Sequence, residues 1–331
     1  MNLPNILIFV ADGMQAKVLS PDHECQTPTI DRLIRRGINI TGAHTTLPTC
    51  SPARASLMTG LLPHNHGVLE VEHGVDTDQC VLREQYPHWA QHLRKSGYAT
   101  AYFGKWHIER TGELDRFGWE TFETLGRISH AEASQKGMGI DNSLDPSTVR
   151  IYKGPKGYND TLMYGVTDLS PEDRQIGRPV TLACEWLKTV PIDQPWCCCT
   201  SFYEPNEALV VGRKAHEQYN ARTLSLPENL CDDLRNRPSI YRRNQQIWRH
   251  FTNEKWQEIL ACYYGRITEL DQQLARLIDV LKLTEQLENT IIIFTSDHGR
   301  YVGAHGLEAH NFGAFEEIYA IPMVVAGPGI A

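Results

Sequence analysis

The chain alternates short apolar runs with longer segments whose apolar residues recur every three or four positions. The short runs are rich in β-branched and aromatic residues and predict buried strands. They cover residues 6–10, 38–43, 99–103, 195–203, 290–295 and 321–326. The longer segments predict helices with one apolar face. They cover residues 29–36, 51–60, 88–96, 180–190 and 254–283. Strands that alternate with helices predict an α/β fold, with a doubly wound, mostly parallel central sheet and helices on both faces.

Two long segments lack this regularity. Residues 126–178 are rich in Gly, Asp and Ser, and residues 213–249 are polar with many Arg and Asn. Long segments of this kind run over the surface and often carry binding residues. We interpret both as surface segments near the mouth of a site.

Composition and charge argue against nucleic-acid binding and membrane binding. The 331 residues carry a net charge of −8, from 32 basic and 40 acidic side chains. A surface of this sign does not attract nucleic acid or an anionic membrane, so an anion-binding site requires a local positive pocket. The sequence has no apolar stretch long enough for a membrane span, and it enters a predicted strand without a signal-peptide pattern. We therefore expect a cytoplasmic protein with no nucleic-acid or membrane partner.

The cysteines do not form a simple disulfide framework. There are nine, an odd number, and Cys197, Cys198 and Cys199 are consecutive within a predicted strand. Neighbouring side chains of a strand face opposite ways. We therefore expect these three to be small side chains of the core.

Cys50 has a different setting, at the start of the predicted helix 51–60 and one turn before Arg54. The first turn of a helix has backbone N–H groups without partners, so an anion binds there readily, and Arg54 adds positive charge. The alternative is a half-buried cysteine ahead of a helix with Pro52 in its first turn. The local pattern alone leaves both interpretations open.

The stretch Cys50-Ser-Pro-Ala-Arg-Ala-Ser-Leu-Met-Thr-Gly60 resembles the signature of the formylglycine-dependent sulfatases, a family of the alkaline phosphatase superfamily. Other segments resemble further blocks of that family, in the same order along the chain. They are Asn5 to Asp12, Thr27 to Leu33, Gly104 to His107, Thr295 to Gly299 and Gly303 to Gly306. The resemblance implies the sulfatase fold, with residues 1–331 as a single catalytic domain and the usual C-terminal subdomain absent.

A metal site is expected where two predicted strands end. Asp12 follows the first strand, Asp297 and His298 follow a late one, and such ends share one edge of an open parallel sheet. The resemblance implies that these residues hold a divalent cation together with Cys50, once Cys50 is oxidised to formylglycine. Ca²⁺ is the family's usual ion. Mn²⁺, Mg²⁺ and Zn²⁺ are alternatives, because Gly13 replaces a second acid that is common in the family and His298 would supply an imidazole.

The resemblance also implies roles for three positive groups. Lys105 would bind a sulfate oxygen, and Arg54 would hydrogen-bond the hydrated aldehyde and add positive charge. His107 would contact the same hydrate and act as the base that releases sulfate.

Two further positions depart from the family pattern. Asn206 stands where members usually carry a histidine that contacts the ester. We expect Asn206 to bind the substrate as a hydrogen-bond donor, but an amide supplies no proton at neutral pH. His310 stands where many members have a lysine, and we expect it to contact the leaving oxygen and to donate the proton there unless water does. His305 is a further candidate for that role.

These features predict a sulfuric ester hydrolase that cleaves a sulfate monoester through formylglycine and a divalent metal. Its partners would be a small-molecule or sugar sulfate ester and a maturing enzyme that oxidises Cys50. One alternative is a phosphonate monoester or phosphodiester hydrolase of the same superfamily, which shares the nucleophile and can lack the second acid. Another is a degenerate, non-catalytic relative, which Gly13, Asn206 and the early end of the chain would explain.

Overall fold

The computed structural model describes residues 3–83, 85–125, 144–153, 160–206 and 208–330. Its centre is a seven-stranded sheet in the order β2-β10-β9-β1-β7-β3-β4. The strands are β1 (Asn5–Asp12), β2 (Gly37–Asn39), β3 (Ala99–Gly104), β4 (Thr121–Thr124), β7 (Trp196–Pro205), β9 (Thr290–Ser296) and β10 (Met323–Ala326). β10 runs antiparallel to its two neighbours, and the other pairings are parallel. The predicted α/β fold with a mostly parallel sheet is confirmed.

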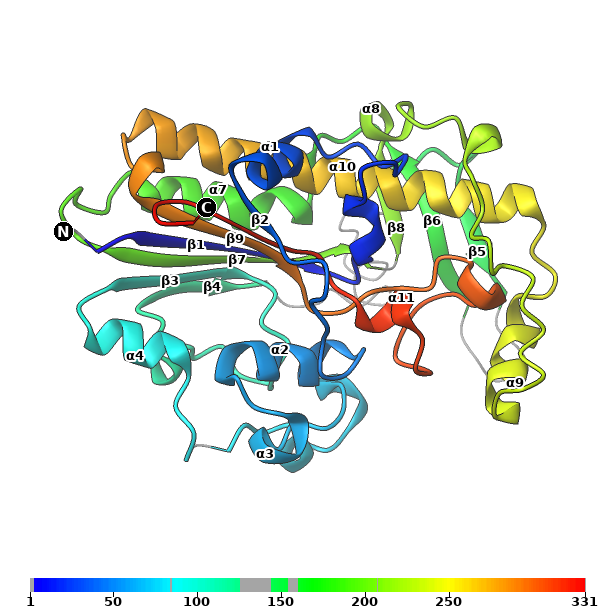
Figure 1. Ribbon diagram of the computed structural model, residues 1–331, viewed down its shortest axis with the longest axis horizontal. Helices are drawn as coiled ribbons and strands as arrows, with labels where there is room; N and C mark the ends of the chain where they lie inside the picture. Colours follow the sequence, from blue (N-terminus) through cyan, green and yellow to red (C-terminus); the bar gives the residue numbers. More distant parts are fainter. Residues whose placement is uncertain (1–2, 84, 126–143, 154–159, 207, 331) are drawn as a thin grey trace.

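Helices cover both faces of this sheet, as Figure 1 shows. One face carries α1 (Pro28–Arg36), α7 (Arg178–Leu187) and α10 (Asn253–Leu283). The other carries α2 (Cys50–Thr59), α3 (Pro63–His66) and α4 (Trp89–Lys95).

The alternation of side chains along the strands builds one core on each face. Leu7 and Phe9 of β1 pack into the core under α10, while Ile8 and Val10 pack into the core under α2 and α4. The consecutive cysteines of β7 follow the same rule, since Cys198 joins the first core and its two neighbours join the second. Their predicted role as core side chains is confirmed.

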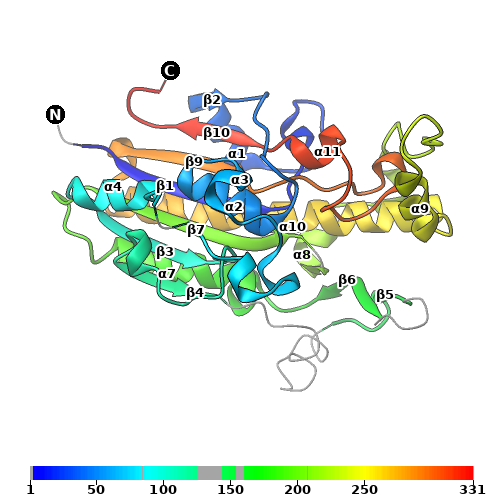
Figure 2. The same ribbon diagram turned by 90° about the horizontal axis from the view of Figure 1, so that it is seen from below.

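A second, three-stranded sheet lies beyond the end of the central one (Figures 1 and 2). Its strands are β5 (Arg150–Tyr152), β6 (Thr161–Thr167) and β8 (Leu209–Gly212). Three short helices complete the described elements of this type: α8 (Arg213–His216), α9 (Ser239–Trp248) and α11 (Glu316–Tyr319).

The second sheet corrects part of the sequence interpretation. The segment 126–178 was expected to be an irregular surface segment, yet most of β6 is buried, because it pairs with β8 and packs on α10. Residues 126–143 and 154–159 of that segment lie outside the described residues. The prediction of a surface segment agrees better with the structure at residues 213–249, because α9, the longest helix in this fully described segment, has no buried residue.

The edge strand β2 and its neighbour β10 are shorter than predicted. β2 ends at Asn39 instead of residue 43, since its partner β10 offers only four residues for pairing. β10 begins at Met323, after Pro322, which has no N–H to donate to a ladder. Among the described residues, no helix combines the length and the apolar character that a membrane crossing requires.

Candidate active site

The candidate site lies at the carboxyl edge of the central sheet. β1 lies between β9 and β7, and β3 follows β7, so the ends of these four parallel strands are neighbours. Asp12 is the last residue of β1, Asp297 and His298 follow β9, and Lys105 follows β3. α2 begins at the same edge with Cys50 as its first residue. The fold therefore brings together the residues that the strand ends predicted.

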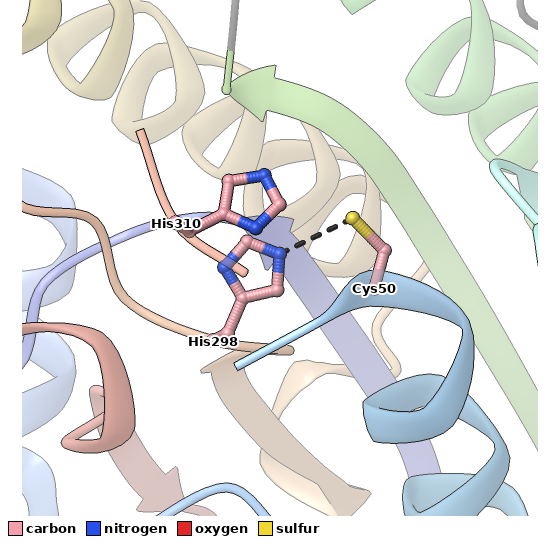
Figure 3. Close-up of side chains that lie close together, drawn as sticks. All are labelled: Cys50, His298 and His310. Carbon is pink, nitrogen blue, oxygen red and sulfur yellow. Dashed lines mark hydrogen bonds between the residues drawn. The ribbon is translucent and has the colours of Figure 1, made fainter. Parts of the chain in front are cut away.

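Four buried side chains form what we call the four-ligand cluster: Asp12, Cys50, Asp297 and His298. His298 Nε2 lies 3.2 Å from Cys50 Sγ (Figure 3), 3.5 Å from Asp12 Oδ1 and 3.7 Å from Asp297 Oδ1. Cys50 Sγ lies 3.8 Å from Asp12 Oδ1. Donor atoms around one divalent cation lie roughly 3–4 Å apart, as bonds of about 2.0–2.3 Å require. The spacing and the chemistry of these donors therefore fit a metal ion.

Arg54 neutralises the two carboxylates of this cluster. Its Nε donates to Asp297 Oδ2 at 2.8 Å, and its Nη2 donates to Asp12 Oδ2 at 3.2 Å. Nη1 donates to the hydroxyl of Ser201 at 2.6 Å and to the carbonyl of Lys105 at 3.2 Å. Burial opposes the charge of Arg54, but the two carboxylates outweigh it and raise the pKa of the guanidinium. Arg54 is thus a fixed cation, clamped between both acids.

Lys105 and His298 add further positive charge around Asp12. The ammonium of Lys105 is hydrogen-bonded to Asp12 Oδ2. Burial acts to raise the pKa of Asp12, but Lys105, Arg54 and His298 together hold it well below the usual range. Burial acts to lower the pKa of His298, but Asp297, Cys50 and Asp12 raise it to about 10. Coordination of a metal through His298 Nε2 would require the loss of the proton from that nitrogen, so metal binding there would depend on pH.

Gly13, where the family commonly has a second acid, lies against His298 and Asn206. Its backbone has φ +73°, a left-handed conformation that favours glycine. A Cβ atom there would lie 3.5 Å from the ring of His298 and 3.7 Å from the side chain of Asn206. The backbone N–H of Gly13 donates to Asp297 Oδ1 at 3.2 Å. The imidazole of His298 thus lies against the position from which a second carboxylate would extend.

Asn206 and His310 both enter the site. Asn206 Nδ2 donates to Asp12 Oδ1 at 2.8 Å and lies 3.2 Å from His310 Nε2. The ring of His310 stacks on that of His298 with centroids 4.0 Å apart (Figure 3). Burial and the charge of His298 lower the pKa of His310 well below its usual value.

His305, the further candidate, belongs to another network. Its Nδ1 lies 2.7 Å from Asp232 Oδ2, and its ring stacks on Phe315 with centroids 3.7 Å apart. Because Asp232 and Phe315 engage its ring, these contacts do not support the predicted role of His305 as proton donor to the leaving oxygen.

His107 is buried next to the four-ligand cluster and contacts two further side chains, His73 and Glu72. Burial, followed by the charges of Lys105 and Arg54, lowers its pKa far below the usual range, so the ring is neutral. Its Nε2 lies 3.1 Å from His73 Nδ1 and 3.6 Å from Glu72 Oε1. Glu72 and His73 were not predicted as site residues, because nothing in their local sequence pattern indicates a partner in the segment after β3.

Arg300 also contacts a site residue, Asn206, and was not predicted from the sequence. Its Nη1 donates to Asn206 Oδ1 at 2.7 Å, and its Nη2 pairs with Glu308 at 2.7 Å. Arg300 orients the amide of Asn206 so that Nδ2 faces Asp12. The sequence feature that could have indicated a role for Arg300 is its position two residues after His298.

The fold and the site define a member of the alkaline phosphatase superfamily, in which buried acids and cations gather at the carboxyl edge of an α/β sheet. The family model described as Sulfatase matches residues 4–331, and the chain belongs to the sulfatase family.

Individual relatives agree with this assignment. The chain is 28% identical to the choline-sulfatase of Rhizobium meliloti, over 99% of this chain and 63% of that protein. It is 27% identical to an arylsulfatase of Clostridium perfringens, over 98% of this chain and 69% of that protein. Among solved structures, the phosphonate monoester hydrolase of Agrobacterium radiobacter has a TM-score of 0.77 at 24% identity, and the match covers 98% of this chain and 68% of that one. The chain thus spans about two thirds of the length of these relatives.

Proposed function

We propose that this chain carries the catalytic site of a sulfuric ester hydrolase that cleaves a sulfate monoester. The position of Cys50 carries the proposal: it is the first residue of α2, and its Sγ lies 3.2 Å from His298 and 3.8 Å from Asp12. Thr49, the N-cap residue, makes no side-chain hydrogen bond to the helix, so the N–H groups of the first turn are not capped there. Membership of the sulfatase family supports the same reaction.

Two groups would complete the site. Formylglycine made from Cys50 by a maturing enzyme would supply a hydrated aldehyde as nucleophile, and a divalent cation held by the four-ligand cluster would polarise the ester. Ca²⁺ is the ion that the family resemblance predicts. The imidazole of His298 supports Mn²⁺ better, and the lack of a carboxylate at Gly13 leaves fewer oxygen ligands than the roughly six to eight that Ca²⁺ takes, which keeps Mg²⁺ as a further alternative.

The chain's own cations would hold the substrate anion. Arg54 and Lys105 are almost fully buried beside Asp12, so their charges act with little screening by water. His107 is neutral and keeps one nitrogen, Nδ1, that makes no hydrogen bond within the described part of the chain. We assign to Nδ1 the proton that leaves the aldehyde hydrate when sulfate is released, because the negative charge of the sulfate ester would offset the charges of Lys105 and Arg54 that lower the pKa of His107 in the free site.

The hydrogen bonds of His310 bear on the leaving group. Asn206 Nδ2 donates to His310 Nε2, so in the neutral ring Nδ1 holds the proton and donates to the carbonyl of Pro48 at 3.2 Å. Nε2 then has no proton for a leaving oxygen, and burial opposes the imidazolium form. We therefore propose that His310 and Asn206 position the ester and that water protonates the leaving alcohol.

Peptide mass spectrometry on Cys50 tests this proposal. Protein produced beside a formylglycine-generating enzyme is expected to have a peptide about 18 Da lighter than the cysteine form. Parallel assays with aryl, sugar and alkyl sulfates then identify the alcohol. A chain that keeps the Cys50 thiol and binds no divalent metal would instead be the non-catalytic relative.

The second candidate is a phosphonate monoester or phosphodiester hydrolase. The combination of Gly13 with His298 favours this second candidate, because an ion in the four-ligand cluster would be held without the second acid. The two candidates separate when kcat/KM for an aryl sulfate is compared with the values for the aryl phosphonate monoester and the aryl phosphodiester of the same leaving group. A higher value for either phosphorus ester would reverse our order of preference.

A further inference from the structure

Beside the four-ligand cluster lies a second group of potential metal ligands: Glu72, His73 and His107. We propose that these three side chains bind one Zn²⁺ ion and that this ion inhibits the enzyme reversibly. The inhibition rests on the proposed role of His107 as a base. The metal site itself rests on geometry alone.

The three donor atoms already have the spacing of a zinc site. His73 Nδ1 lies 3.1 Å from His107 Nε2, His107 Nε2 lies 3.6 Å from Glu72 Oε1, and Glu72 Oε1 lies 3.9 Å from His73 Nδ1. Tetrahedral Zn²⁺ with bonds of about 2.0–2.1 Å places its ligands about 3.3–3.4 Å apart. One ion between the three atoms therefore requires shifts of only a few tenths of an ångström, and its fourth position is left for water.

The surroundings hold this arrangement in place. Glu72 and His73 lie in a short 3₁₀ helix, Glu72–Gly74, whose first N–H donates to the hydroxyl of Ser51 at 3.0 Å. The second carboxylate oxygen of Glu72 accepts from Arg110 Nε at 3.3 Å, which orients the carboxylate as outer partners do in metal sites. The side chain of His73 is 48% exposed, so an ion can enter from solvent.

The donor set selects the ion. Two neutral imidazoles and one carboxylate are typical zinc ligands, whereas Ca²⁺ and Mg²⁺ prefer oxygen donors. Arg110 neutralises part of the charge of Glu72, so affinity depends on the imidazole nitrogens. The site would therefore take Zn²⁺ or a similar transition metal without competing for Ca²⁺ or Mg²⁺.

The same contact explains inhibition. A neutral imidazole that binds a metal through Nε2 has its one proton on Nδ1. His107 Nδ1, the buried nitrogen that we assign as proton acceptor, would then already be protonated. Zn²⁺ would thus block the release of sulfate without contacting the four-ligand cluster.

Metal counting on His73→Ala tests the site independently of activity. Wild type is expected to bind one more Zn²⁺ per chain than His73→Ala by equilibrium dialysis with elemental analysis. Co²⁺ should show the lost site as d–d absorption without a thiolate band, since this site has only nitrogen and oxygen donors. His92→Ala, which removes an exposed histidine of α4, is the matched control and should bind as wild type does. Equal metal counts in wild type and His73→Ala would overturn the proposal.

The activity assay addresses inhibition. With the metal of the four-ligand cluster supplied in excess, and with the turnover of each protein expressed relative to its own zinc-free value, His73→Ala should need at least about tenfold more Zn²⁺ for half-inhibition. Zinc that binds at His73 without lowering turnover would overturn the inhibitory role. A chain without esterase activity under any condition would contradict the proposed function, and the cobalt and zinc counts would still decide the site.

Discussion

β7 contributes to two buried clusters of charge that differ in character. Through Ser201 it contacts Arg54, which is paired with both acids of the four-ligand cluster. Through Glu204 it contacts Arg266, at 3.1 Å, in what we call the arginine cluster. The other members of the arginine cluster are Arg174 and Glu269, which form an ion pair. Both clusters pair guanidinium groups with carboxylates inside the protein.

Their pKa shifts have opposite signs. Asp12 has its pKa held well below normal, because Lys105, Arg54 and His298 outweigh burial. Burial raises the pKa of Glu269 and lowers that of Arg266, although each has partners of opposite charge. The arginine cluster therefore only partly compensates for its own burial, as structural ion pairs do. The four-ligand cluster favours the ionised form of Asp12, which is what a metal site requires.

The largest effect expected in this comparison follows Cys50→Ala. Removal of the nucleophile should lower kcat by at least about 10³-fold, whereas the change of one small buried side chain leaves the fold intact. Turnover and thermal unfolding of the same preparation measure both. Cys231→Ala, at an exposed cysteine, is the control and should keep full activity. Unchanged activity in the Cys50→Ala protein would exclude Cys50 as the source of the nucleophile.

Asp297→Asn should have the next largest effect. It removes one acid that contacts both Arg54 and His298, so the divalent metal of the four-ligand cluster should dissociate. Turnover should therefore fall by about 10²-fold or more. Elemental analysis and turnover at saturating metal are the measurements. Asp232→Asn, which breaks a carboxylate contact with His305 outside the site, should retain metal and activity. If Asp297→Asn retained the metal of the four-ligand cluster, the carboxylate of Asp297 would not be a metal ligand.

Arg54→Met tests the charge balance through stability. In the presence of a chelator, it leaves Asp12 and Asp297 without their shared partner and should cost about 3–5 kcal/mol of unfolding free energy. Added divalent cation should restore part of that loss, since it binds the same carboxylates. Urea unfolding with and without metal measures both. Arg36→Met is the control, because its exposed ion pair with Glu288 should be worth less than about 1 kcal/mol. A loss of that small size for Arg54→Met would show that the two clusters do not differ as we argue.

The sequence predicted the four-ligand cluster better than its surroundings. Asp12, Asp297 and His298 follow strands that are buried on both faces, and such strands form long apolar runs that are easily recognised. Parallel pairing then places their ends together. Glu72 and His73 meet His107 only through the folded chain, and neither lies in a periodic segment.

The arginine cluster was not predictable for a related reason. Arg266 and Glu269 lie on α10, where charged residues normally mark the solvent-facing side of a helix. Here β8 of the second sheet covers that side, and Gly212 donates its N–H to Glu269 Oε1 at 3.0 Å. The sequence pattern predicts no strand at β8, and from the sequence alone we interpret the segment that holds β5 and β6 as a surface segment, so the burial of these charges could not be inferred. Tertiary contacts, and not local pattern, decide which charges are buried.

Glu269→Gln is expected to have the smallest effect and gives the pH test of the comparison. Glutamine can still accept from Gly212 and Arg174, and the ionised form is already disfavoured by burial, so at neutral pH the unfolding free energy should stay within about 1–2 kcal/mol of wild type. The folded-state pKa of Glu269 is raised above its ordinary value of 4.5, so the folded state takes up a proton before the unfolded chain does. The resulting stabilisation is fully present below pH 4.5 and is lost as the pH rises through the folded-state pKa. Urea unfolding should therefore show wild type gaining stability relative to Glu269→Gln as the pH falls from neutral to 4.5. The opposite trend would mean that Arg174 outweighs burial and that the arginine cluster resembles the four-ligand cluster after all.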